Sequence, residues 1–227
     1  LTYKPTNFLD NKLIVPTVVD DYFRFDLVEG HVHDMGAAMM DGISGHAGLF
    51  GNSLDIAKIL QLFLQKGSYA NEKFFDEKFF DLFNFRHFEE KKVRRGIGFD
   101  KPELDPDDPN TCGCVSDKSF GHYGFTGSVA WVDPDTEIIY VFLSNRTFPD
   151  ENNNSLSDYN IRTEIQKLVH EAFDWMNIII VCYPTYGGSG VLATELGHKL
   201  AEFGHKIHFV AYKKPVLLKL IDNKVLF

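Results

Sequence analysis

The amino-acid sequence predicts a mixed α/β (α+β) protein, in which an antiparallel sheet with packed helices over residues 1–175 precedes a partial β-α-β unit over residues 176–227. The first observation is a pair of β-rich runs, Val129–Val132 and Ile138–Leu143, on either side of a turn that contains proline. Such runs are typical of an antiparallel hairpin. Apolar residues then recur at helical spacing over 161–173, which predicts an amphipathic helix against one face of that sheet.

The second observation is the change of pattern after Trp175. An unbroken apolar run, Ile178–Val181, leads into the loop Gly187-Gly188-Ser189-Gly190, then a helix and a second strand over Ile207–Tyr212. This order predicts a parallel β-α-β unit. Because only roughly fifty residues follow Trp175, one such unit leaves strand faces without cover, and we expect it to be part of a larger domain.

The composition is that of a globular protein, since 44% of the 227 residues are hydrophobic and 24% are charged. The formal net charge of −9 disfavours nucleic-acid binding, because the phosphate backbone requires a basic surface. One basic cluster, Lys91, Lys92, Arg94 and Arg95, follows two glutamates and is interpreted as a solvated loop. No apolar stretch approaches the roughly 18 residues of a membrane-spanning helix.

The elements before the hairpin are predicted in order along the chain. Residues 1–29 combine apolar pieces with two prolines, which favours an extended, loop-rich segment; because the chain begins with Leu1, we expect its true start upstream. Ser53 is expected to cap a helix that ends at Gly67. The proline-rich acidic stretch 101–110 is expected to be a solvated loop. A set of phenylalanines at helical spacing is expected to pack in the core: Phe74, Phe75, Phe79, Phe80 and Phe83.

Neither a metal site nor a cofactor follows from the sequence. Cys112, Cys114 and Cys182 predict neither a disulfide framework nor a zinc site, because no second ligand pair stands at zinc spacing. His31 and His33 alternate on one side of an extended backbone, so a metal pair is conceivable, but a loop held by side-chain hydrogen bonds is favoured. Ser44 does not match a nucleophile elbow, because His46 stands where glycine is needed.

The string Phe120–Gly127 is the most informative candidate site in residues 1–175. A strand of small residues lets a substrate lie against the backbone, where its amides can face a carbonyl oxygen. The alternative is that the glycines only permit bends or bulges in an edge strand. Spacing alone leaves both interpretations open.

Most of residues 30–175 is covered by a series of strings: Val32-His33-Asp34, Gly45–Phe50, Asp55-Ile56-Ala57, Arg95–Phe99, Phe120–Gly127, Trp131–Pro134 and Phe142–Arg146. These strings, which run in family order, carry a resemblance to the penicillin-binding-protein-like serine hydrolases related to class C β-lactamases, including versions fused to family 3 glycoside hydrolases. It implies that His122-Tyr123-Gly124 matches the family's H-x-G motif and that the Phe125 amide is an oxyanion-hole donor. Tyr123 and Thr126 would line the substrate site. His122 stands where the K-T-G form of this motif has lysine, so the permanent positive charge at this position is weakened. Hydrolysis of an ester, amide or peptide is therefore expected in preference to β-lactam turnover.

The family's nucleophile motif, S-x-x-K, does not occur in these 227 residues. Tyr69-Ala70-Asn71 spells the family's Y-x-N motif, but it follows the Ser53 helix, where the family has an ordinary loop, so we reject it. The resemblance therefore implies the C-terminal half of a hydrolase for a small-molecule substrate, inactive alone. The alternative is a binding module without catalysis, which associates through exposed apolar surface.

The glycine loop before the last helix is either an anion site or a tight strand-to-helix turn. The string from Met176 to Phe209 resembles the start of family 4 glycosyltransferases of the N-acetyl-α-D-glucosaminyl L-malate synthase type, from bacillithiol synthesis, which have two-domain Rossmann-like GT-B folds. This resemblance implies that Gly188, Ser189 and Gly190 contact a nucleotide sugar or acceptor. It also implies two joined, truncated reading frames with conflicting locations, exported for the hydrolase-like part and cytoplasmic for the other.

Overall fold

The computed structural model describes residues 1–227 except 106, 175–176, 183–188, 203, 216 and 221–224. The chain divides into two compact units, Leu1–Lys167 and Leu168–Phe227, with α5 (Ile161–Asp174) running from the first into the second. The division at 175/176 expected from the resemblances stays a prediction.

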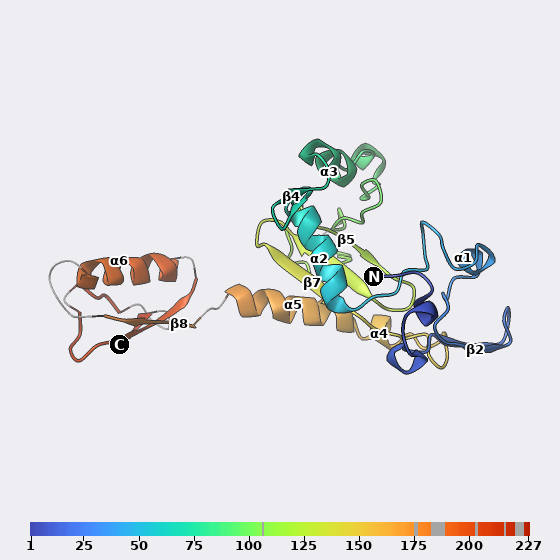
Figure 1. The fold of residues 1–227 in the computed structure, drawn as a ribbon. Helices are drawn as coiled ribbons and strands as arrows, with labels where there is room; N and C mark the ends of the chain where they lie inside the picture. The colour runs from blue at the N-terminus through green and yellow to red at the C-terminus, as the bar shows by residue number, and fades with distance from the viewer. Residues whose placement is uncertain (106, 175–176, 183–188, 203, 216, 221–224) are drawn as a thin grey trace. The chain divides into compact units, whose positions relative to one another are not determined.

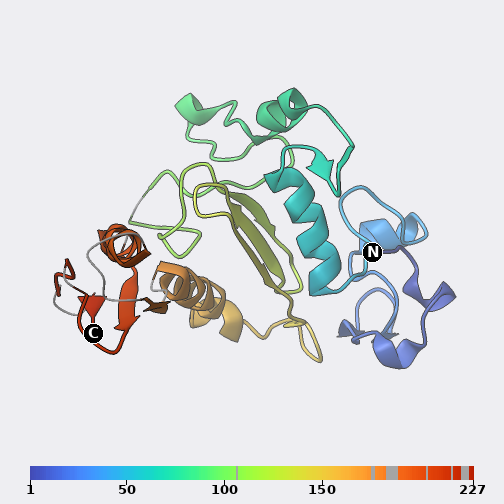
Figure 2. The same cartoon turned by 60° about the vertical axis from the view of Figure 1, so that its left-hand side comes forward.

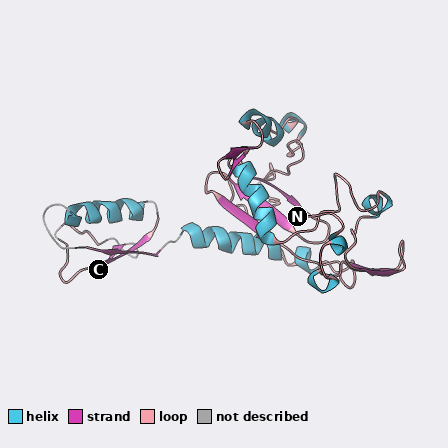
Figure 3. Ribbon diagram, in the orientation of Figure 1, coloured by secondary structure: helices cyan, strands magenta, loops and turns pink. Residues whose placement is uncertain are grey.

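A three-stranded antiparallel sheet forms the centre of the first unit (Figures 1 and 3). Its strands β5 (Phe120–Tyr123), β6 (Val129–Asp133) and β7 (Ile138–Phe142) are paired in that order. The β6–β7 pair is the hairpin that the sequence predicts, so that prediction is confirmed. Trp131 of β6 lies between Gly121 of β5 and Tyr140 of β7.

The two faces of this sheet are covered by different helices (Figure 2). The helix α2 (Ser53–Leu64) packs against β7, and the core on this side contains Leu60, Phe80, Phe120 and Val132. On the opposite face, the Tyr140 hydroxyl donates a hydrogen bond to the Arg162 carbonyl oxygen at 2.8 Å, which ties the start of α5 to the sheet. The predicted mixed α/β class is confirmed for this unit.

The ends of α2 differ in detail from the prediction. Asn52 caps the helix, because its side chain accepts a hydrogen bond from the Asp55 backbone N–H, and Ser53 is the first helical residue. At the other end the Lys66 backbone takes the left-handed conformation with φ 50°, and the Gly67 N–H reaches back to the Leu62 carbonyl oxygen at 2.9 Å. Gly67 is thus the second residue beyond the cap, not the first.

The phenylalanine stripe is only partly buried, so the prediction that all five pack in the core is wrong. Phe80 of α3 (Glu77–Asn84) is 6% exposed and Phe75 packs against the core cluster that contains Phe80, but Phe74, Phe79 and Phe83 are exposed. Phe79 and Phe83 lie four residues apart and share one stripe of the helix, while Phe80 faces the sheet. A short helix that packs through one face leaves that stripe in solvent.

The remaining elements of the first unit are short, and the loop-rich start is confirmed. They are η1 (Pro5–Asn7), η2 (Asn11–Leu13), β1 (Val18–Asp20), β2 (Asp26–Val28), α1 (Met35–Met39), β3 (Ser68–Tyr69), β4 (Glu72–Lys73), η3 (Glu89–Lys91) and α4 (Ser155–Asp158). Tyr69-Ala70-Asn71 lies at the tip of the β3–β4 hairpin, where Ala70 and Asn71 both have positive φ. This is a tight hairpin turn.

The long connection before β5 contains a disulfide that the sequence analysis did not predict. Cys112 and Cys114 are bonded, with their Cα atoms 5.2 Å apart, whereas Cys182 has a free thiol. Two residues of separation suffice when the chain turns back on itself, and this distance lies within the usual range for a disulfide. The acidic stretch before it carries exposed Asp105, Asp107 and Asp108, as predicted for a solvated loop.

The second unit contains the predicted parallel β-α-β arrangement. The strand β8 (Asn177–Val181) is followed by α6 (Ser189–Glu202) and β9 (Lys206–Val210), and β9 pairs in parallel with both β8 and the short β10 (Val225–Leu226). Its core is formed by a small set of side chains: Ala201, Ile207, Phe209, Leu218 and Val225. Among the described residues, no helix is long and apolar enough to cross a membrane.

Candidate functional site

The edge strand β5 carries the predicted H-x-G string, but it is shorter than the sequence suggests. The strand ends at Tyr123, and Gly124 to Gly127 form the turn to β6, closed by hydrogen bonds from Gly127 N–H to the Gly124 carbonyl and from Gly124 N–H to the Ser128 carbonyl. On its outer side, Gly121 exchanges two backbone hydrogen bonds with Asp100, at 2.8 and 3.0 Å. The turn therefore projects from the end of a strand that is anchored on both sides.

His122 is exposed on the α2 side of the sheet and has a defined orientation. Its Nδ1 donates to the Tyr123 carbonyl oxygen at 2.7 Å, and the Arg95 Nη1 donates to its Nε2 at 3.0 Å. Since Nε2 accepts in this arrangement, these contacts assign the neutral tautomer with its proton on Nδ1. The imidazole is thus paired with a permanently charged guanidinium.

Arg95 is the residue of this site that the sequence analysis missed. The prediction of a solvated loop holds for Lys91, Lys92 and Arg95, which are exposed, whereas Arg94 is half-buried. Both arginines contact the buried carboxylate of Asp100. Arg94 makes two hydrogen bonds to it at 2.8 and 3.0 Å and a third to Glu103, and Arg95 lies 3.6 Å from it. The hydrogen bonds that Arg94 donates to the Asp100 carboxylate raise the pKa of Arg94.

Arg146 fixes the turn after His122 through two carbonyl groups, and the backbone N–H of Phe125 stays without an acceptor among the described residues. Arg146 donates through Nε to the Phe125 carbonyl oxygen at 3.0 Å and through its backbone N–H to the Thr126 carbonyl oxygen at 2.9 Å. The Arg146 guanidinium lies 4.8 Å from the Phe125 ring centroid, and the His33 ring lies 5.1 Å from it. Within the part of the chain that the structure describes, the Phe125 backbone N–H donates to no protein acceptor.

The segment that contains His33, Asp34 and His46, which we call the histidine loop, is held by side-chain hydrogen bonds, as predicted. One Asp34 carboxylate oxygen accepts from the Ala37 N–H at 2.7 Å and lies 2.9 Å from His46 Nε2, while Ser44 Oγ lies 2.7 Å from His46 Nδ1. These contacts, the Ala37 amide foremost, lower the pKa of Asp34. His33 lies against Phe125 and 3.5 Å from Glu151. Through the His33 ring, the histidine loop contacts Phe125 in the turn that follows the H-x-G string.

Tyr123 projects to the opposite face of the sheet from His122 because successive strand residues alternate. Its hydroxyl donates to the Asn110 carbonyl oxygen, and the Arg162 guanidinium lies 5.0 Å from its ring centroid. Burial raises the pKa of this hydroxyl. Tyr123 and Thr126 were predicted to line the substrate site. Thr126 lies in the turn after β5, whereas only the main chain of Tyr123 is accessible from the face of the sheet that carries His122.

The predicted glycine-loop residues are described in part. Gly188 lies outside the described residues, Ser189 is the first residue of α6, and Gly190 is the second. The Gly190 carbonyl oxygen accepts a hydrogen bond from the Thr194 hydroxyl at 2.8 Å inside that helix.

Comparisons with known proteins identify the family of the chain. The sequence model described as Beta-lactamase matches residues 11–163. The chain is 36% identical over 137 residues to an N-acetylmuramyl-L-alanine amidase of Bacillus subtilis (strain 168), a match covering 58% of this chain and 31% of the relative. It is 36% identical over 124 residues to a putative D-alanyl-D-alanine carboxypeptidase of Salmonella agona (strain SL483), covering 54% of this chain and 28% of the relative. The chain thus spans less than a third of these relatives, and it belongs to the Beta-lactamase family.

Proposed function

We propose that residues 1–175 form the substrate-binding wall of a serine hydrolase that cleaves amide or peptide bonds. Membership of the Beta-lactamase family supports hydrolase chemistry. The relatives named N-acetylmuramyl-L-alanine amidase and D-alanyl-D-alanine carboxypeptidase support muramyl-peptide substrates rather than β-lactams.

The observation that carries this proposal is the contact between Arg95 and His122. A neutral imidazole alone is a poor partner for a substrate carboxylate. The guanidinium beside it supplies the permanent positive charge that lysine would give, and it can bind a carboxylate through several N–H groups. His122 then orients the substrate and Arg95 provides most of the electrostatic attraction.

The open amide of Phe125 is the proposed oxyanion donor. When a carbonyl carbon is attacked, negative charge develops on its oxygen, and a preorganised N–H lowers the energy of that state. The Gly124 carbonyl oxygen, which shares a peptide plane with the Phe125 N–H, accepts a hydrogen bond from the Gly127 N–H at 3.0 Å, so this plane need not reorganise during the reaction. Gly124 adds no side chain between the amide and the substrate.

We further propose that these 227 residues do not hydrolyse substrate alone, because they contain no S-x-x-K sequence to supply nucleophile and base. The purified chain is assayed with a chromogenic cephalosporin and with nitrophenyl esters. No turnover above the buffer rate is expected. Saturable hydrolysis that disappears in His122→Ala would show that a nucleophile is present after all.

Binding is tested separately by calorimetric titration with N-acetylmuramyl-L-alanine, which carries a carboxylate. Arg95→Gln is expected to weaken binding by at least about tenfold, the scale of one lost charge-assisted hydrogen bond. Arg162→Gln is the matched control, because Arg162 lies over Tyr123 on the opposite face of the sheet. Equal losses in both variants would contradict the proposed site. Binding with no turnover is also the result expected of a binding module without catalysis.

For residues 176–227 we propose the start of a glycosyltransferase domain, in which Gly188, Ser189 and Gly190 contact a nucleotide sugar or acceptor. The parallel pairing of β8 and β9 around α6 supports this, because a strand followed by a helix N-terminus is suited to anions. Since pockets bury most of a ligand, we expect no useful affinity from this loop alone. Calorimetry with UDP-N-acetylglucosamine tests the expected lack of affinity. Micromolar binding that is weakened by Gly188→Val would contradict that expectation.

A further inference from the structure

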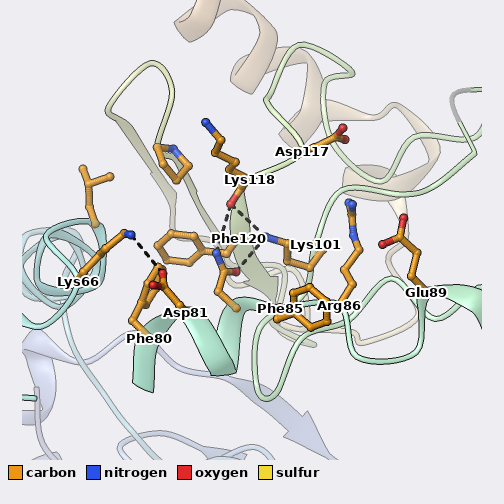
Figure 4. A pocket seen from close by; sticks show the side chains of 13 residues that line it. Lys66, Phe80, Asp81, Phe85, Arg86, Glu89, Lys101, Asp117, Lys118 and Phe120 are labelled. Atoms are coloured by element: carbon orange, nitrogen blue, oxygen red, sulfur yellow. Dashed lines mark hydrogen bonds and ion pairs between the residues drawn. The ribbon is translucent and has the colours of Figure 1, made fainter. Parts of the chain in front are cut away.

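A cavity of about 430 Å³ lies on the α2 and α3 side of the first unit, beside the start of β5 (Figure 4). Phe80, Phe85 and Phe120 contribute apolar walls, and Lys101 and Arg86 also line it. Ligand pockets typically have volumes from about 300 to 1,000 Å³. We call this space the Lys101 cavity, and neither the proposed hydrolase site nor the second unit uses it.

Lys101 is a buried cation whose two partners are neutral. The residue is 3% exposed, and its Nζ donates to the Asn84 side-chain oxygen at 2.9 Å and to the Lys118 carbonyl oxygen at 3.0 Å. An ammonium has three N–H donors, so one remains unused by the described residues. Neither acceptor balances the positive charge, and a buried charge without a counter-charge is costly.

Arg86 places a second cation next to the first. Its Nη2 donates to the Pro102 carbonyl oxygen at 3.0 Å, while its Nε is buried and has no hydrogen-bond partner among the described residues. No described carboxylate forms an ion pair with either Arg86 or Lys101. Burial, followed by the Arg86 charge, lowers the pKa of Lys101 to about 8, whereas Asp117 acts in the opposite direction.

The other charges around the cavity are distributed differently. Lys66 lies 2.6 Å from Glu77 and 3.2 Å from Asp81, and Lys118 lies 2.6 Å from Asp135, so these two lysines are paired. Asp117 and Glu89 also line the space, but neither forms an ion pair with Lys101 or Arg86 among the described residues. The unbalanced positive charge is therefore concentrated at Lys101 and Arg86.

We propose that the Lys101 cavity binds a small organic carboxylate, which takes the unused donors of Lys101 and Arg86 and lays its apolar body against the phenylalanine walls. Hydrogen bonds from cationic donors to a carboxylate are stronger than those to neutral acceptors. The competing explanation is that Lys101 is purely structural and only ties Asn84 of α3 to the strand that follows Lys118.

The test is a calorimetric titration of the full chain with benzoate, which combines a carboxylate with an apolar ring. Wild-type protein is expected to bind benzoate at least about tenfold more tightly than benzyl alcohol, its neutral counterpart. Lys101→Met and Arg86→Gln are each expected to weaken benzoate binding by a similar factor. Lys118→Met is the matched control, because the Lys118 ammonium pairs with Asp135, and it should bind benzoate like the wild type.

Three results would overturn the proposal. They are no binding of benzoate to the wild type, equal binding of benzoate and benzyl alcohol, and unchanged binding in both variants of the cations. Inorganic phosphate is titrated as well, and phosphate that binds more tightly than benzoate contradicts the assignment to a carboxylate with an apolar body. The two variants remove different cations, so a folding defect in one, detected by its melting curve, leaves the other to decide.

Discussion

Gly121 of β5 has no room for a side chain. A Cβ at this position would lie 2.2 Å from the Ala130 carbonyl oxygen and 2.7 Å from the Trp131 ring. The first glycine of the string Phe120–Gly127 is therefore required by close packing, and because it is regularly paired with Trp131 it marks neither a bend nor a bulge. The case for a substrate-binding role rests on the residues after it.

We expect Gly121→Ala to lower the free energy of unfolding by about 2 kcal/mol or more, because backbone atoms must move to admit the methyl group. Gly124→Ala is the control, since its Cβ would lie 3.5 Å from its nearest neighbour, the Ser128 carbonyl oxygen. Urea denaturation of both variants measures the difference. Equal destabilisation by the two substitutions would mean that the packing at Gly121 is not tight.

Lys101 predicts a specific dependence of stability on pH. Its pKa is about 8 in the folded protein and 10.5 in a model compound, so between these values the unfolded chain binds a proton that the folded protein does not. Stability therefore rises as pH increases from 8 to 10.5, by on the order of 3 kcal/mol at most. Denaturation at several pH values shows this as a rise in wild type relative to Lys101→Met, and a constant difference would contradict the lowered pKa.

The residues of the candidate site differ in how far sequence could identify them. His122, Gly124 and Phe125 are neighbours in the chain, so one string reveals all three. Arg95 lies 27 residues away and reaches His122 because Asp100 holds both its guanidinium and β5, which spacing alone does not show. The string beginning at Arg95 contributes to the family resemblance, but it does not indicate a contact with His122.

At the scale of elements, α2 shows what a capping prediction can and cannot fix. The sequence locates this helix because its apolar residues recur at helical spacing, but two adjacent residues, Asn52 and Ser53, are both good caps. Asn52→Ala is expected to cost about 1 kcal/mol, because the Asp55 N–H loses its acceptor, and Ser53→Ala to cost a few tenths at most. Thermal unfolding of both variants decides, and the reverse order would place the cap at Ser53.

The hairpin β6–β7 is predictable because two β-rich runs flank a turn that contains proline, and the helix α5 because its apolar residues recur with the 3.6-residue period of a helix. The stripe of α3 follows the same period but is only partly covered, since burial depends on which face meets the sheet. The Cys112–Cys114 disulfide depends on a local chain reversal that cysteine spacing does not encode. Periodicity predicts elements and leaves their surroundings open.

At the scale of the whole molecule, exposed apolar side chains predict association. Phe79 and Phe83 of α3 are 59% and 43% exposed, and Phe85 and Phe88 that follow are also more than half exposed. We expect a concentration-dependent increase of molar mass in size-exclusion chromatography with light scattering, reduced by the double substitution Phe79→Ser and Phe83→Ser. A monomer at every concentration would show that this surface does not self-associate.

The proposed function requires a carboxylate-bearing muramyl peptide to bind between Arg95, His122 and the Phe125 amide. Two-dimensional amide NMR of the full chain titrated with N-acetylmuramyl-L-alanine measures this binding. We expect a saturable shift of the Phe125 amide signal together with those of His122 and Thr126, and we expect Arg95→Gln to abolish it. Saturable shifts that do not include the Phe125 amide signal, or the same shifts in Arg95→Gln, would contradict this binding site.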